Sequence, residues 1–166
     1  MKLKDIKLNK KELMSTKLLC FDVGKTTGWC ASDVRLGYDA YEFGEFRWKD
    51  KSDFYNKVKD LVELYKPDMI CVLHPYGRMV GMAQSRLIGV IELIACKLDV
   101  CFFDYLTDCQ MRTYVFRRCV AGPQPIISRM TSLTGSDKEL TENEADACML
   151  SMVVSNIIKQ NIQKSS

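Results

Sequence analysis

The chain has 166 residues, of which 47% are apolar and 27% charged, and this composition is typical of a soluble globular protein with one full-sized core. Its net charge of +3 permits a local basic patch for nucleic acid but does not by itself indicate one. No run approaches the roughly 20 apolar residues of a transmembrane helix, so we expect no membrane span and no membrane partner.

The cysteine pattern favours a reducing compartment. Eight cysteines occur without a Cys-x-x-Cys pair, and a single histidine cannot complete a zinc-finger set. Cys20, Cys71 and Cys101 fall in strand-like apolar runs, and Cys96 and Cys148 fall in helix-like ones. We expect the eight thiols to be buried and reduced, as in the cytoplasm of a bacterium or, for a viral protein, of its host cell.

The two ends of the chain read as tails around one domain. Residues 1–16 alternate lysines with apolar residues and lack the hydrophobic centre of a secretory peptide. They predict a basic tail that is solvated or partly disordered, although its lysines could also lie on phosphates. Residues 161–166 form a short C-terminal tail, which leaves a domain from 17 to 160.

The first half of that domain predicts three hairpin-linked strands, a helix and a buried strand. Gly and Asp in the short connections suit antiparallel hairpins, and the continuous apolar run of the fourth strand predicts cover on both of its faces. The predicted strands are Lys17–Asp22, Gly28–Asp33, Ala40–Phe46 and Met69–Leu73, and the helix is Asp53–Lys66.

The second half predicts one more strand among helices, and the last helix opens with a capping box from Thr141 to Glu144. The order of elements predicts an α/β fold with a five-stranded mixed sheet, three antiparallel strands followed by two parallel ones, flanked by helices. The predicted helices are Val80–Leu98, Gln110–Cys119, Ile126–Leu133 and Thr141–Gln160, and the strand is Val100–Phe103.

Two carboxylates stand on separate predicted elements. Asp22 ends the first strand, just before Gly24 and Gly28, and Asp146 lies near the start of the last helix. Two acids delivered by rigid elements are the usual beginning of a divalent-metal site for phosphodiester chemistry. Each also has a simpler interpretation, Asp22 as a turn residue and Asp146 as an acid that interacts with the helix dipole.

The element order and four sequence blocks resemble the ribonuclease H-like fold, and more closely the RuvC family of Holliday junction resolvases, especially its compact phage-type members. The blocks are FDVGKTTGW at 21–29, PDMICVL at 67–73, RLIGVIE at 86–92 and EADA at 144–147. The resemblance implies an endonuclease that resolves four-way or branched DNA junctions, acts as a homodimer and uses Mg²⁺ or Mn²⁺.

The resemblance also implies a set of ligands. Asp22 matches the first-strand ligand, Asp146 the last-helix ligand, and Asn143, one turn earlier, the other helical ligand. Glu144 is an acidic neighbour that could bind the ion, although the capping box accounts for it fully. Glu142 is expected to face solvent, but its i,i+4 relation to Asp146 keeps it possible.

The fourth ligand of the family, a Glu at the end of the central strand, is absent. His74 occupies that place, or Leu73 if the neighbouring Pro75 sets the register. An imidazole suits Mn²⁺ better than Mg²⁺ and could act as a general base. The alternative interpretation is that the site has lost an acid and that His74 only ends a strand. The catalytic set predicted from the sequence is Asp22, His74, Asn143 and Asp146.

Basic residues lie in the segments that would flank this site. Arginine suits phosphate because its planar guanidinium donates two parallel hydrogen bonds, while the simpler interpretation for each residue is solvated surface. The predicted DNA-binding residues are Lys25, Arg78, Arg112, Arg117, Arg118 and Arg129.

The sequence leaves three classes of function open. The first is an active, metal-dependent junction endonuclease. The second is a protein that keeps the nuclease fold and binds branched DNA or a protein partner without cleaving, which the missing Glu and Asn143 favour. The third is a nucleotide-binding domain of the actin and sugar-kinase type, whose phosphate loop also reads Asp-x-Gly-x-Thr, but the chain is too short for its two lobes.

Overall fold

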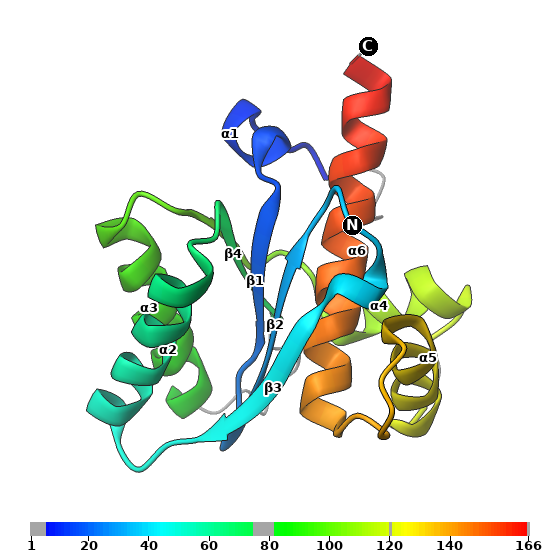
Figure 1. Cartoon of the computed structure of the whole chain (residues 1–166). Coiled ribbons are helices and arrows are strands. Elements are labelled where there is room, and N and C mark those ends of the chain that lie inside the picture. The colour runs from blue at the N-terminus through cyan, green and yellow to red at the C-terminus, as the bar shows by residue number, and fades with distance from the viewer. Residues whose placement is uncertain (1–5, 75–81, 120, 166) are drawn as a thin grey trace.

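A five-stranded mixed sheet with helices on both faces organises the chain (Figure 1). The computed structural model describes residues 6–74, 82–119 and 121–165. The strand order is β3-β2-β1-β4-β5, in which β1, β2 and β3 pair antiparallel while β4 and β5 run parallel to β1. The predicted sheet, three antiparallel strands followed by two parallel ones, is therefore confirmed.

The elements follow the predicted order closely. The strands are β1 (Lys17–Asp22), β2 (Thr26–Asp33), β3 (Glu42–Arg47), β4 (Met69–Val72) and β5 (Cys101–Phe103). The helices are α1 (Lys10–Met14), η2 (Tyr38–Ala40), α2 (Lys51–Tyr65), α3 (Met82–Lys97), α4 (Asp108–Phe116), α5 (Gln124–Thr134) and α6 (Glu142–Ser165). Pro75, Arg78 and the expected helix start at Val80 lie outside the described residues.

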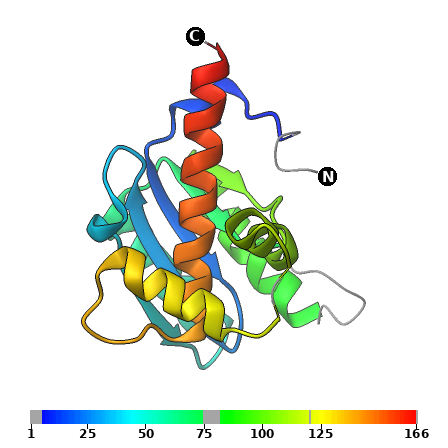
Figure 2. The same ribbon diagram turned by 90° about the vertical axis from the view of Figure 1, so that its right-hand side faces the viewer.

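Two hydrophobic cores lie on opposite faces of the sheet, and the side-chain alternation of β1 separates them. Leu18 and Cys20 belong to the core shared with α6, whereas Leu19 and Phe21 belong to the core shared with α2 and α3. Figures 1 and 2 show α6 lying along the sheet, with α4 and α5 on its own side and α2 and α3 on the other. By this alternation Asp22, two residues after Cys20, belongs to the α6 face.

The N-terminal segment differs from the solvated tail that we expected. Residues 10–14 form α1, whose capping box joins Asn9 and Glu12 through backbone–side-chain hydrogen bonds of 2.9 and 2.6 Å. Ile6 is buried in the α6-side core. From residue 6 onward the segment therefore packs on the domain, because an apolar anchor and a satisfied cap stabilise it.

Burial of all eight thiols was also expected, and this is wrong. Cys20, Cys30, Cys71 and Cys148 are buried, but Cys101 is only half-buried and three others are exposed. Cys96 lies on the outer face of α3, and Cys109 and Cys119 lie at either end of the α4 region. All eight are free thiols. Within the described residues, no helix is long and apolar enough to cross a bilayer.

Candidate metal site at the carboxyl edge of the sheet

The carboxyl ends of β1, β4 and β5 meet at one edge of the sheet. Asp22 ends β1, His74 follows β4, and Asp104 follows β5. The chain remains paired past the ends of the strands, because the Leu73 amide donates to the Phe21 carbonyl at 3.0 Å. Ligands of α/β proteins characteristically bind at this edge, beyond the carboxyl ends of the strands.

Gly28 brings the start of α6 against Asp22. Gly28 is the register partner of Asp22 in the β1–β2 pair, so their Cα atoms lie about 5 Å apart. A Cβ atom on Gly28 would meet the Asn143 carbonyl oxygen at 2.0 Å and its carbon at 2.3 Å. Only glycine permits this approach of two backbones. The first turn of α6 therefore lies beside Asp22, and Asp146 follows one turn later along the helix.

The loop after Asp22 is held by side-chain hydrogen bonds. The Gly24 carbonyl accepts from Trp48 Nε1 at 2.9 Å and from Thr27 Oγ1 at 3.2 Å. The Val23 carbonyl accepts from Gln84 Nε2 at 2.7 Å. Because these bonds fix the loop backbone, Asp22 has a stiff support.

Asp146 is a buried carboxylate with an unsatisfied oxygen. It is 7% exposed, and its Oδ1 has no hydrogen-bond partner among the described residues. Burial, followed by the negative charges of Asp22 and Asp108, raises the pKa of Asp146 to about 7. A buried oxygen without a partner costs folding free energy, so its presence favours a site that a cation completes.

Asp22 carries a raised pKa for the same reasons. Burial, then the charges of Asp108 and Glu142, raises the pKa of Asp22 to about 6. The charge of Asp22 also raises the pKa of Asp146. Two buried acids of raised pKa favour the presence of a positive charge beside them.

Two further carboxylates, outside the ligand set predicted from the sequence, act on this pair through their charge. Glu142 opens α6, one turn before Asp146, and Asp108 opens α4. Glu142 is exposed, as expected, and its i,i+4 spacing from Asp146 is what kept it a possible ligand. Asp108 gave no signal that distinguished it from a helix-capping acid, because the sequence placed the start of this helix at Gln110, whereas the helix begins two residues earlier at Asp108 and is capped by Thr107.

His74 lies away from the acidic pair. Its Nδ1 is 3.7 Å from Asp104 Oδ2, and the imidazole is 50% exposed. Ile70 and Val72, the alternate residues before it in β4, pack on the α2–α3 side. The register that pairs Phe21 with Val72 places Leu73, not His74, beside Asp22. The structure therefore does not bring His74 together with Asp22 and Asp146.

Asn143 and Glu144 are engaged in other contacts. The Asn143 side-chain amide donates to Glu45 Oε2 at 3.2 Å, so its nitrogen is directed to β3. Glu144 Oε2 accepts from the Thr141 amide at 2.9 Å, and the Glu144 amide donates to Thr141 Oγ1 at 3.2 Å. The capping box predicted from the sequence is confirmed, and it occupies the carboxylate of Glu144.

Asp22 and Asp146 together suit a Mg²⁺ or Mn²⁺ ion that keeps most of its water ligands, and do not suit an ion that is surrounded by protein ligands alone. Within residues 6–74, 82–119 and 121–165, no three His, Cys, Asp or Glu side chains lie close enough to hold a metal ion together. Mg²⁺ in enzymes typically keeps several waters and binds one or two carboxylates, with the substrate phosphate supplying further oxygens. Asp22 and the unsatisfied oxygen of Asp146 meet that requirement.

The basic residues predicted to bind DNA divide into two groups. Lys25 is exposed on the loop beside Asp22, and Arg117, Arg118 and Arg129 are also exposed. Arg112 departs from the prediction, because it is only 8% exposed and its Nε donates to both carboxylate oxygens of Asp108 at 2.7 Å. It is a buried partner of an acid, and its guanidinium is not available as a surface phosphate contact.

Arg117 and Arg129 line one groove beside α6. The groove has a volume of about 300 Å³ and includes Met152, Asn156 and Gln160 of α6. These three residues follow Asp146 by 6 to 14 positions, which corresponds to roughly 9–21 Å along a helix. The groove therefore begins beyond the acidic edge and lies on the side of the molecule where α4 and α5 lie.

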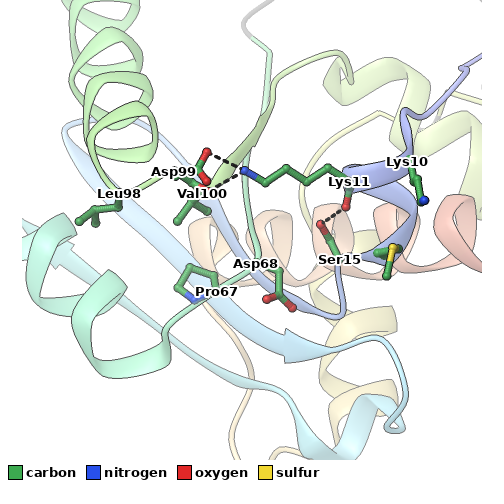
Figure 3. A pocket seen from close by; sticks show the side chains of 9 residues that line it. Lys10, Lys11, Ser15, Pro67, Asp68, Leu98, Asp99 and Val100 are labelled. Atoms are coloured by element: carbon green, nitrogen blue, oxygen red, sulfur yellow. Dashed lines mark hydrogen bonds and ion pairs between the residues drawn. The ribbon is translucent and has the colours of Figure 1, made fainter.

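A second, larger pocket lies at the opposite edge of the sheet (Figure 3). It has a volume of about 660 Å³ and lies where β4 and β5 begin, far from Asp22. Lys11 Nζ, on one side of this pocket, donates to Asp99 Oδ1, on the other side, at 2.8 Å (Figure 3). Its lining residues are Lys10, Lys11, Met14, Ser15, Pro67, Asp68, Leu98, Asp99 and Val100.

Comparison with known proteins identifies the fold. No protein-family profile and no curated protein matches the sequence. The structure is similar to RuvC of Thermus thermophilus, with a TM-score of 0.68 and 13% identity over 89% of this chain and 96% of RuvC.

Two other solved structures agree. T. thermophilus RuvC in complex with Holliday junction substrate gives a TM-score of 0.66 and 10% identity, over 89% of this chain and 96% of RuvC. The yeast mitochondrial Holliday junction resolvase Ydc2 gives a TM-score of 0.56 and 14% identity, over 98% of this chain and 88% of the resolvase. The chain therefore has the ribonuclease H-like fold of RuvC-type resolvases.

Proposed function

We propose that this protein is a metal-dependent endonuclease that cleaves four-way or other branched DNA junctions. The observation that supports the proposal is the packing of Gly28, the register partner of Asp22, on Asn143 in the first turn of α6. From it we infer that Asp146, one turn later, lies near Asp22. Two acids of raised pKa, one with a buried unsatisfied oxygen, at the carboxyl edge of a RuvC-type sheet support a cation site.

In this proposal Asp22 and Asp146 hold Mg²⁺ or Mn²⁺. The bound ion would supply Lewis-acid activation of a phosphodiester and of the attacking water. Burial removes the two carboxylates from most of the solvent, so their charges act on the ion with little screening. Glu144 is committed to the helix cap, and His74 faces Asp104, so we include neither among the ligands.

The DNA backbone would follow the exposed basic residues. Lys25 is exposed on the hydrogen-bonded loop that follows Asp22, and in this proposal it would contact the scissile phosphate or its neighbour. Arg117 and Arg129, along the groove beside α6, would contact phosphates about two to three turns of the helix farther away. Phosphate contacts of this kind give affinity and orientation but no sequence preference.

We further propose that the protein acts as a homodimer. A four-way junction has a twofold arrangement of strands, and its resolution requires two symmetric cuts. A pair of identical sites related by a twofold axis supplies both. Sedimentation velocity of the protein, alone and with a synthetic junction, tests this proposal and is expected to give two protomers per junction.

The deciding experiment is cleavage of a labelled synthetic four-way junction in Mn²⁺ and in Mg²⁺. Wild type is expected to cut the junction and to leave a linear duplex of the same sequence intact. Asp22→Asn and Asp146→Asn are expected to abolish cutting while retaining binding. Asp104→Asn, which removes an acid at the same edge outside the acidic pair, is the matched control and is expected to cut normally. An intact junction across a full metal titration of wild type would reject the nuclease.

A protein that binds branched DNA without cutting it is the second candidate. The observation that favours it is the absence, within the described chain, of three acids close enough to hold an ion together, with Leu73 beside Asp22. This candidate predicts tight junction binding that is unchanged by chelators and by Asp22→Asn. Because the nuclease is also expected to bind the junction after Asp22→Asn, cleavage distinguishes the two candidates: this one binds the junction in mobility shifts but leaves it intact at every Mn²⁺ and Mg²⁺ concentration.

A further inference from the structure

Asp108 lies on the β5 side of the sheet edge at which Asp22 ends β1. The His74 amide donates to the Leu106 carbonyl at 2.8 Å, and His74 pairs with Thr107 in a parallel bridge. Asp108 follows directly as the first residue of α4. Asp22 and Asp108 therefore lie on either side of the segment that continues β4, two strand spacings or about 10 Å apart at the backbone.

The charge of Asp108 reaches both members of the acidic pair. The charge of Asp108 raises the pKa of both Asp22 and Asp146, while Arg112 acts on Asp146 in the opposite direction and more weakly than Asp108 does. The α4 helix packs against α6, so its first turn lies on the same face of the sheet as Asp146. The unsatisfied Oδ1 of Asp146, in a residue that is only 7% exposed, is independent evidence of a positively charged occupant.

Arg112 holds Asp108 in place. Its Nε is 2.7 Å from both carboxylate oxygens of Asp108, and its Nη1 donates to the Gly122 carbonyl. Because Arg112 is buried, it fixes the Asp108 carboxylate instead of leaving it to rotate in solvent. Asp108 itself is about half exposed on its side chain, so it remains accessible from the site.

We propose that Asp108 supplies the third negative charge of the cation site, in place of the carboxylate that the sheet lacks beside Asp22, and that Arg112 is its positioning residue. This inference rests on the proposed function. Asp108 acts on the ion across its hydration shell, which agrees with the lack of three converging ligands in the described residues. The hydration of Mg²⁺ and Mn²⁺ makes such an outer acid effective.

The test is the affinity of the full-length protein for Mn²⁺ alone, measured by titration calorimetry at fixed pH. Asp108→Asn keeps the shape of the side chain and removes its charge, and it is expected to weaken Mn²⁺ binding by about 10- to 100-fold. Asp108→Glu restores the charge and is expected to bind within a few-fold of wild type. Asp104→Asn, the acid beside His74, is the matched control and is expected to bind as wild type does.

The results separate this inference from the function on which it rests. If Asp108→Asn binds Mn²⁺ as tightly as wild type while Asp22→Asn loses binding, the role of Asp108 is overturned and the cation site stands. Unchanged binding in Asp22→Asn as well overturns the cation site. Near-ultraviolet circular dichroism establishes that each variant is folded; if Asp108→Asn is not, Asp108→Ser takes its place with the same expectation. Arg112→Lys, which keeps the charge but loses the two-oxygen contact, is expected to weaken Mn²⁺ binding less than Asp108→Asn does.

Discussion

Gly28 and Asn143 pack backbone against backbone, so closely that a Cβ atom added to Gly28 would fall 2.0 Å from the Asn143 carbonyl oxygen. No side chain fits between β2 and the first turn of α6 at this point, and the obstacle is main chain that cannot swing away. Since Asp22 is the register partner of Gly28, this one contact sets the separation between Asp22 and the helix that carries Asp146.

Gly28→Ala is therefore expected to displace the start of α6 and to weaken Mn²⁺ binding by at least about tenfold, with a loss of stability of about 1–3 kcal/mol from overpacking. Gly89→Ala is the matched control, because a Cβ there meets nothing within 4 Å and alanine favours the interior of α3. It is expected to stabilise by up to about 1 kcal/mol and to leave Mn²⁺ binding unchanged. Urea denaturation and calorimetry measure both; a Gly28→Ala protein with wild-type affinity would contradict this role of the contact.

The acidic pair predicts that the metal-free protein loses stability as pH rises. In the unfolded chain an aspartate has a pKa of about 4, whereas burial and neighbouring charge raise the pKa of Asp22 to about 6 and of Asp146 to about 7. Between these values the folded state binds more protons than the unfolded state, so the free energy of unfolding falls as pH rises through the folded pKa values.

Asp146→Asn removes the larger part of this dependence. In EDTA it is expected to be more stable than wild type at pH 8, on the order of 2–4 kcal/mol, and close to wild type at pH 4. Urea denaturation at the two pH values measures the difference. Equal pH dependence in the two proteins would show that Asp146 ionises as an ordinary surface acid.

The fold could be predicted from the periodicity of apolar residues and from the order of the predicted elements, whereas the site could be predicted only in part. The apolar runs and hairpin connections fixed the five strands, and the Thr141–Glu144 box marked the start of α6. The face of Asp22 became clear only from the structure, in which Leu18 and Cys20 of β1 pack toward α6, because the continuous apolar run of β1 shows no alternation in the sequence.

The remaining parts of the site could not be predicted, in part because strands that are buried on both faces show no alternation of apolar and polar residues. In β4 every residue is buried, so the apolar run carries no alternation from which the face of His74 can be deduced. Only the register that pairs Phe21 with Val72 shows that Leu73 aligns with Asp22. Asp108 was missed because its role depends on the pairing of His74 with Thr107, a contact between segments about 30 residues apart that no local pattern encodes.

Glu144 offers a test that separates a cap from a ligand. Glutamine keeps the hydrogen bond to the Thr141 amide, so Glu144→Gln is expected to match wild type within about 0.5 kcal/mol and in Mn²⁺ affinity. Glu144→Ala is expected to lose about 1 kcal/mol of stability through the unsatisfied amide, again with little change in affinity. If Glu144→Gln lost Mn²⁺ binding while staying as stable as wild type, the carboxylate would be a ligand after all.

The groove beside α6 predicts how junction binding responds to salt. Arg117 and Arg129 line it with exposed guanidinium groups, and each phosphate contact releases counterions from DNA. Arg129→Ala and Arg117→Ala are each expected to weaken binding similarly for every junction sequence and to reduce the slope of log affinity against log salt by about 1. Arg35→Ala is the control, since Arg35 pairs with Asp33 at the far end of β2. The slope is measured by fluorescence anisotropy between about 50 and 200 mM salt. An unchanged slope in both groove variants would show that the DNA binds on another face of the protein.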